Sequence, residues 1–163
     1  MNLSFHPKAG PPADLSTDPA FFDLVSGSYA RIVGETLVPE ILTRTEAARW
    51  LYEQAPFCLL AHNTEKDPRF IYGNKAVQRC FEYDWQELTN LPSRLSAELP
   101  NREERKRLLE MVERQGFISD YQGIRIAKSG RRFRIENTTV WELRDAVGVR
   151  YGQAAMFRHW ENL

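Results

Sequence analysis

Apolar residues recur at intervals of three and four positions between residues 18 and 33, which predicts a helix with one buried stripe. The residues of this stripe are Phe21, Phe22, Val25, Tyr29, Ile32 and Val33. Asp18 and Pro19 form a typical start, because aspartate caps a helix and proline fits its first turn. A second helix is expected from Thr43, since Thr43 and Glu46 have the spacing of a capping box.

Beyond residue 56 the pattern changes to short apolar or alternating runs separated by turn residues, which indicates strands. The expected strands cover residues 57–62, 70–72, 118–127, 132–143 and 149–157. Helices are expected after Asn74, which can act as a cap, and over residues 101–116. The order of two strands, helices and three strands predicts an α+β domain, with a five-stranded antiparallel sheet and helices on one face.

The same pattern divides the chain into three parts. Residues 1–17 lack periodicity and are expected to form a disordered tail, residues 18–55 a helical extension, and residues 56–163 the folded domain. The apolar stripe of the extension has to be buried somewhere. We expect a homodimer through the region before residue 56, and folding of the extension onto its own sheet is the alternative.

Composition narrows the classes of partner. Lys and Arg number 22, as do Asp and Glu, so net charge gives no reason to expect nucleic acid or a membrane surface. The apolar runs are far shorter than the ~20 residues of a membrane span, and no signal peptide is recognisable. Cys58 and Cys80 lack the spacing of a zinc site or a disulfide framework. A cytoplasmic location is the default expectation.

Residues 74–95 carry a family resemblance. They read Asn74-x-Ala76-Val77, Phe81-Glu82-Tyr83, Glu87-Leu88 and Pro92-Ser93-Arg94-Leu95. Without a gap, this resembles N-x-A-F, T-G-Y, E-V and N-C-R-F of the LOV subgroup of PAS domains. Over residues 55–160, and most clearly in 91–98 and 129–136, the chain is similar to the MEKHLA domain, a PAS-related family. The resemblance implies a PAS-type fold and a sensory module that is not an enzyme.

Departures from the LOV pattern argue against a flavin photoreceptor. Ser93 stands where the resemblance places the cysteine that adds to flavin, and a hydroxyl is a far weaker nucleophile than a thiol. Arg125 and Ile135 stand where two asparagines would hydrogen-bond the flavin ring. Arg94 is retained where LOV arginines meet the flavin phosphate, although pairing with a surface glutamate is the commoner role of an arginine. Flavin is therefore disfavoured as a cofactor.

Other cofactors find no support. The helix over residues 101–115 contains no histidine, whereas heme-binding PAS domains supply an axial histidine from the matching helix. No pair of histidines or carboxylates has metal-ligand spacing. Neither heme nor a metal is expected.

Polar residues on an apolar strand face are the main candidates for binding a ligand. Alternation over residues 132–143 places one set on the face toward the helices: Phe133, Ile135, Asn137, Thr139, Trp141 and Leu143. Gln153 interrupts the last strand in the same way. Either a ligand or other polar groups of the protein can supply the partners that such side chains need. With two residues from the helix side, the candidate site comprises Ser93, Arg94, Asn137, Thr139 and Gln153.

Three functions remain open. The first is a sensory module that binds a small molecule, and the second is a protein-interaction module with a filled core. The third is a flavin-binding LOV-like protein without adduct chemistry. No recognisable catalytic motif is present. Because the extension is too small for an output domain, we expect the output to act through a separate signalling partner.

Overall fold

The computed structural model describes residues 14–163, so residues 1–13 of the expected disordered tail lie outside the described residues. Within residues 14–17, Leu15 is buried against the core. The helices are α1 (Pro19–Ser28), the π-helix η1 (Tyr29–Val33), α2 (Arg44–Glu53), α3 (Lys75–Phe81), α4 (Trp85–Leu88), the 3-10 helix η2 (Ser93–Ser96) and α5 (Leu99–Gln115). The strands are β1 (Cys58–His62), β2 (Phe70–Gly73), β3 (Phe117–Ile126), β4 (Arg132–Arg144), β5 (Arg150–Phe157) and β6 (His159–Asn162).

The expected helix starts are confirmed by their caps. Asp18 accepts a hydrogen bond from the backbone N–H of Ala20 at 3.1 Å. Thr43 and Glu46 form the reciprocal capping box. The backbone N–H of Glu46 donates to the Thr43 hydroxyl at 3.2 Å, and the backbone N–H of Thr43 donates to the Glu46 carboxylate at 3.0 Å. Helix α5 begins at Leu99, two residues before the expected start, because proline is compatible with the first turn of a helix.

All strand pairings are antiparallel, and the order is β2-β1-β5-β4-β3. The predicted α+β fold is therefore confirmed. The structure adds a sixth strand, β6, which pairs with the first part of β4, so that Ile135 lies opposite Trp160. All four residues of β6 are exposed, so this strand lacks the alternation of apolar and polar residues by which the other strands are recognised.

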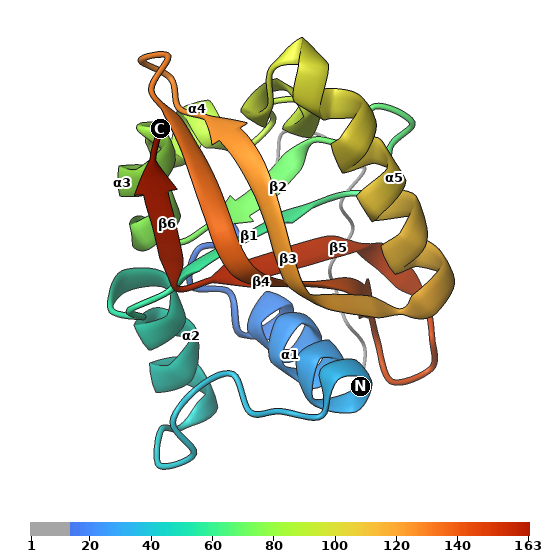
Figure 1. The fold of residues 1–163 in the computed structure, drawn as a ribbon. Coiled ribbons are helices and arrows are strands. Elements are labelled where there is room, and N and C mark those ends of the chain that lie inside the picture. The colour runs from blue at the N-terminus through green and yellow to red at the C-terminus, as the bar shows by residue number, and fades with distance from the viewer. Residues whose placement is uncertain (1–13) are drawn as a thin grey trace.

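Helices cover both faces of the sheet (Figure 1). Helices α3 and α5 pack on one face, around a core that includes Phe81, Leu108 and Phe133. Helices α1 and α2 pack on the other face, around Trp141 and Leu143. The extension is thus a second layer on the sheet.

The apolar stripe of α1 is buried by the sheet of the same chain. Val25 is fully buried, and the ring of Phe21 lies 5.0 Å from that of Tyr72. The ring centroid of Tyr29, at the start of η1, lies 4.8 Å from that of Trp141. Burial of each such side chain contributes about 1.5–3 kcal/mol. Folding back, the alternative considered from the sequence, is what the structure shows, and the stripe no longer gives a reason to expect a dimer.

Asn74 fixes the helices relative to the sheet. This fully buried side chain accepts hydrogen bonds from the N–H groups of Leu59 and Val77, both at 3.1 Å. It also donates to the carbonyl oxygens of Leu51 at 3.1 Å and Phe57 at 2.9 Å. One side chain therefore joins α2, β1 and α3, in addition to capping α3 as expected.

The face assignment predicted for the strand over residues 132–143 is wrong beyond residue 136. Asn137 has a φ of 48°, and the register between β3 and β4 shifts beside it. Such a bulge moves the following side chains to the other face. Phe133 and Ile135 face α5, whereas Trp141 and Leu143 face α1.

Candidate functional site

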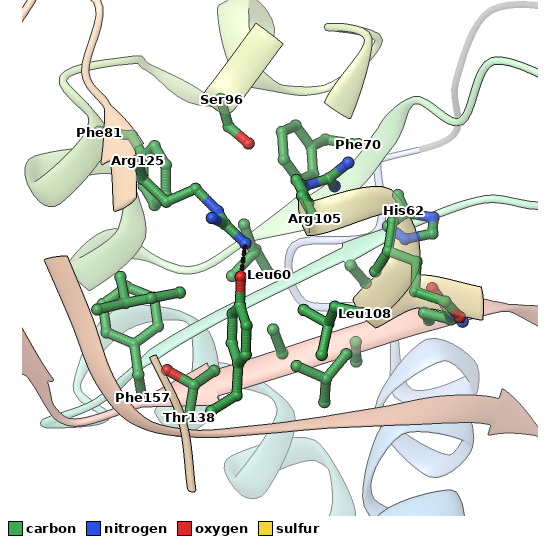
Figure 2. A pocket seen from close by; sticks show the side chains of 18 residues that line it. Leu60, His62, Phe70, Phe81, Ser96, Arg105, Leu108, Arg125, Thr138 and Phe157 are labelled. Atoms are coloured by element: carbon green, nitrogen blue, oxygen red, sulfur yellow. Dashed lines mark hydrogen bonds between the residues drawn. The ribbon is translucent and has the colours of Figure 1, made fainter. Parts of the chain in front are cut away.

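A pocket lies inside the domain, between the sheet and helix α5 (Figure 2). We call it the inner pocket. Its volume is about 50 Å³, enough for about three to five water-sized groups. Most of its lining is apolar and comes from Leu60, Phe70, Phe81, Leu108, Ile135, Val140 and Phe157.

Two arginines reach into this apolar space. Arg105 comes from α5 and is 8% exposed, and Arg125 comes from β3 and is 6% exposed. No aspartate or glutamate is found among the described residues that line the inner pocket. A buried charge is normally paired with an opposite charge. Because Arg105 and Arg125 line the inner pocket without a carboxylate among the described lining residues, the pocket is electropositive as well as largely apolar.

Arg125 has hydrogen-bond partners within the protein. It donates to the carbonyl oxygen of Ile124 at 2.9 Å and to the hydroxyl of Tyr121 at 3.2 Å. The Tyr121 hydroxyl donates in turn to Glu104 at 2.9 Å. Burial raises the pKa of Tyr121, which keeps its hydroxyl protonated and able to donate. This chain of contacts holds the Arg125 side chain at the pocket wall.

Arg105 has no such support, since it forms no hydrogen bond or ion pair with any residue in the range 14–163. Burial, followed by the positive charge of Arg125, lowers the pKa of Arg105 to about 9, so the guanidinium is still charged at pH 7. The buried carboxylate of Glu142 is already engaged by Arg150 and by Gln153. Glu104 attracts the charge of Arg105, but no carboxylate of residues 14–163 forms an ion pair with it.

A larger outer pocket of about 480 Å³ adjoins the inner one. It lies among loop residues 63–68, η2 and the outer side of α5. The two pockets share the lining residues His62, Arg105, Leu109 and Gln153. Six basic and five acidic side chains line the outer pocket, so it does not favour ligands of either charge.

His62 lies at the junction of the two pockets. Its Nδ1 is 2.9 Å from the carbonyl oxygen of Asn63. Burial, followed by the charge of Arg105, lowers the pKa of His62 to about 4. The imidazole is therefore neutral at pH 7 and adds a polar group without adding charge.

The structure brings three of the five predicted site residues to these pockets. Gln153 lines both pockets, and its side-chain amide donates to the Leu109 carbonyl at 3.0 Å and to Glu142 at 2.8 Å. Ser93 lines the outer pocket, and its buried hydroxyl has no hydrogen-bond partner among residues 14–163. Arg94 also lines the outer pocket, where it pairs with Asp67 at 3.2 Å.

The other two predicted residues, Asn137 and Thr139, line neither pocket. Asn137 is exposed at the bulge, and Thr139 lies opposite Met156 on the α1 side of the sheet. The face predicted for Asn137 and Thr139 is wrong for the same reason as that of Trp141. The bulge at Asn137 exchanges the two faces for the residues that follow it. Thr138 takes the inward position and is fully buried at the inner pocket.

Sequence reasoning missed Arg105 as a pocket residue. The charges of residues 102–107 alternate in sign, a pattern typical of a solvated helix face, but Arg105 is spaced three and seven positions before Leu108 and Val112. That spacing places it on the buried side of α5, where the structure has it. The inward position of Arg125 is signalled by its alignment with a flavin-contacting asparagine of LOV domains.

The inner pocket does not fit a flavin. A volume of about 50 Å³ is several-fold below the ~300 Å³ at which pockets for such ligands begin, and Arg125 occupies part of the space. Ser93 has no thiol to offer. Within residues 14–163, no group of three or more His, Cys, Asp or Glu side chains is placed to hold a metal ion. No helix in this part of the chain is both long enough and apolar enough to cross a membrane.

Solved structures with a similar fold are PAS and LOV domains. A PAS domain from Colwellia psychrerythraea has 12% identity and a TM-score of 0.57, covering 69% of this chain and 90% of that one. A PAS domain from a two-component sensor histidine kinase has 18% identity and a TM-score of 0.53, with coverages of 70% and 91%. An RNA-binding light-oxygen-voltage receptor has 16% identity and a TM-score of 0.57, with coverages of 78% and 35%. Identities this low show the fold alone.

The family is shown by the sequence itself. No curated protein matches the chain. The profile described as MEKHLA domain matches residues 20–162, a range that takes in helices α1 and α2 as well as the whole sheet. PAS-like families of this kind are sensory signalling modules and generally non-catalytic. With this match and a PAS-type sheet covered by helices on both faces, the chain belongs to the MEKHLA domain family.

Proposed function

We propose that this chain is a non-catalytic sensory module that binds a small molecule between the sheet and α5. One observation carries the proposal, namely that Arg105 is a buried and charged side chain without a partner, in a pocket that is otherwise largely apolar. Ligand pockets typically combine apolar walls with a few convergent polar groups. A bound molecule would supply the partner that the described residues do not.

The site would comprise residues around the junction of the two pockets. Gln153 and Ser93, both predicted from the sequence, belong to it, and Arg105, Arg125 and Thr138 are added to it. Arg94 is assigned to the entrance, because its ion pair with Asp67 is half-exposed. The output would pass to a separate signalling partner.

Native mass spectrometry of protein purified from its own host tests the proposal. Thr138→Leu would fill the inner pocket, and Thr139→Leu is the matched control, because it places the same side chain on the other face of the same strand. We expect a small molecule to be retained by the wild-type protein and by Thr139→Leu, and lost from Thr138→Leu. Equal retention by both variants, or no bound molecule in any preparation, would contradict the proposal.

A second candidate is a protein-interaction module with a filled core. The small volume of the inner pocket, about 50 Å³, favours it. Homodimerisation, expected from the sequence, belongs to this candidate. A protein concentration of tens of micromolar would populate a dimer of micromolar affinity, and light scattering at that concentration would detect it. A dimer without a retained molecule would favour the interaction module over the sensory one.

A further inference from the structure

Charge is the most selective feature of the inner pocket. An arginine has five N–H donors, and Arg105 uses none of them within residues 14–163, whereas Arg125 uses two. The carboxylate of Glu104 accepts from Tyr121, and that of Glu142 is held by Arg150. The pocket therefore offers several N–H donors on two positive groups, and those of Arg105 are not used by any acceptor within residues 14–163.

The walls restrict which acceptor fits. Leu60, Leu108 and Phe157 offer no hydrogen bonds, so they favour a ligand with a hydrocarbon part over a fully hydrated ion. A planar carboxylate matches the fork of a guanidinium. The volume, sufficient for about three to five water-sized groups, sets an upper limit on the portion of the ligand that is enclosed.

We propose that the inner pocket takes a small organic carboxylate, with its anionic group held by Arg105 and Arg125 and its hydrocarbon part against the apolar wall. The proposal rests on the proposed sensory function and names the chemical class of its ligand. His62 and Gln153 stand at the junction with the outer pocket. They would separate the enclosed part of the ligand from the entrance.

The test uses the full chain and three probes at matched ionic strength: propionate, its neutral analogue propionamide, and inorganic phosphate. Calorimetric titration is carried out on the wild-type protein, Arg105→Met, Arg105→Lys and Arg107→Met. Arg107 is the matched control, since it is an exposed arginine on the same helix. Unfolding midpoints of the ligand-free variants are measured alongside.

We expect propionate, but not propionamide, to bind the wild-type protein and Arg107→Met. Arg105→Met should weaken binding about tenfold or more, because a charge-assisted contact is lost, and Arg105→Lys should restore part of it. Arg105→Met should also unfold at the same or a higher temperature than the wild-type protein, since it removes an unpaired buried charge. Loss of binding would then not result from unfolding.

Other outcomes overturn the proposal in distinguishable ways. If propionamide binds as well as propionate, or Arg105→Met binds propionate like the wild-type protein, the carboxylate is wrong. The sensory function would still stand if Thr138→Leu removed a retained molecule. If phosphate binds and propionate does not, the pocket selects another class of anion. If no probe binds and no molecule is retained in any preparation, both proposals fail.

Discussion

The indole N–H of Trp141 donates a 3.1 Å hydrogen bond to the hydroxyl of Ser28, and both side chains are fully buried. Trp141 lies in β4, and its neighbour Val140 lines the inner pocket on the opposite face. Ser28 is the last residue of α1. Strand β4 is therefore in contact with both the proposed ligand site and the N-terminal helices. We expect any displacement of β4 at the pocket to reach α1 through this contact.

Replacing Ser28 by alanine should lower the free energy of unfolding by about 1–3 kcal/mol, because the buried indole N–H is left without an acceptor. The matched control is Ser26→Ala, two residues earlier in α1. The hydroxyl of Ser26 donates to the carbonyl of Phe22 at 2.8 Å in a partly buried position, so its loss should cost less than about 1 kcal/mol. Urea unfolding measures both. Equal costs would show that the Trp141 contact contributes little.

The buried stripe of α1 leads to a second prediction. Val25→Asp would place a carboxylate against the sheet in a fully buried position, and we expect loss of the folded state. Ala30→Asp, at an exposed position, should leave the fold intact. Circular dichroism and light scattering distinguish the outcomes. A folded Val25→Asp monomer obtained from a dimeric wild-type protein would instead make the stripe a dimer interface.

Close approach of two strands gives the third prediction. Gly152 has a φ of 151°, and a Cβ atom built on it would lie 1.9 Å from the carbonyl oxygen of His62. Gly152→Ala should therefore destabilise the protein by about 2–4 kcal/mol, since backbone atoms have to move. Gly148 has a φ of 91° and open space around it. Gly148→Ala should therefore lower stability by the backbone strain alone, about 1 kcal/mol. Similar unfolding midpoints for the two variants would contradict the clash.

Local signals in the sequence predicted much of the fold. The caps at Thr43 and Asn74 depend on residues only a few positions apart, so their physics is contained in a short stretch of chain. The position of α1 is different in kind. Its periodicity predicts a buried stripe, but the surface that buries it, around Tyr72 and Trp141, lies far away in the sequence. A second copy of the chain could have met the same requirement.

The candidate site was predicted less well, for two physical reasons. The bulge at Asn137 leaves no mark on the alternation of polar and apolar residues, because Thr138 and Thr139 are equally compatible with either face. Arg105 was missed because a buried arginine is rare and its neighbours are charged. Ser93 lies at the outer pocket, where the resemblance places it, and Gln153 faces the inner pocket because alternation is unbroken over residues 153–157, beyond the register shift at Tyr151.

The final prediction concerns pH. Burial lowers the pKa of His62 to about 4, compared with about 6.5 in the unfolded chain. Between these values the unfolded state binds more protons than the folded state, so stability is greatest above pH 6.5 and falls as the pH drops towards 4. The contribution of this residue amounts to about 3 kcal/mol across that range.

His62→Gln should therefore flatten the fall in stability between pH 7 and pH 4.5, whereas His159→Gln, at an exposed position, should leave it unchanged. Urea unfolding midpoints of the three proteins, measured at several pH values in this interval, test the prediction. The comparison within each protein removes any constant cost of the substitution, because only the slope against pH is read. If His62→Gln loses stability on acidification as steeply as the wild-type protein, then His62 accepts its proton without unfolding the domain. The junction between the two pockets would in that case have to admit a charged imidazole beside Arg105.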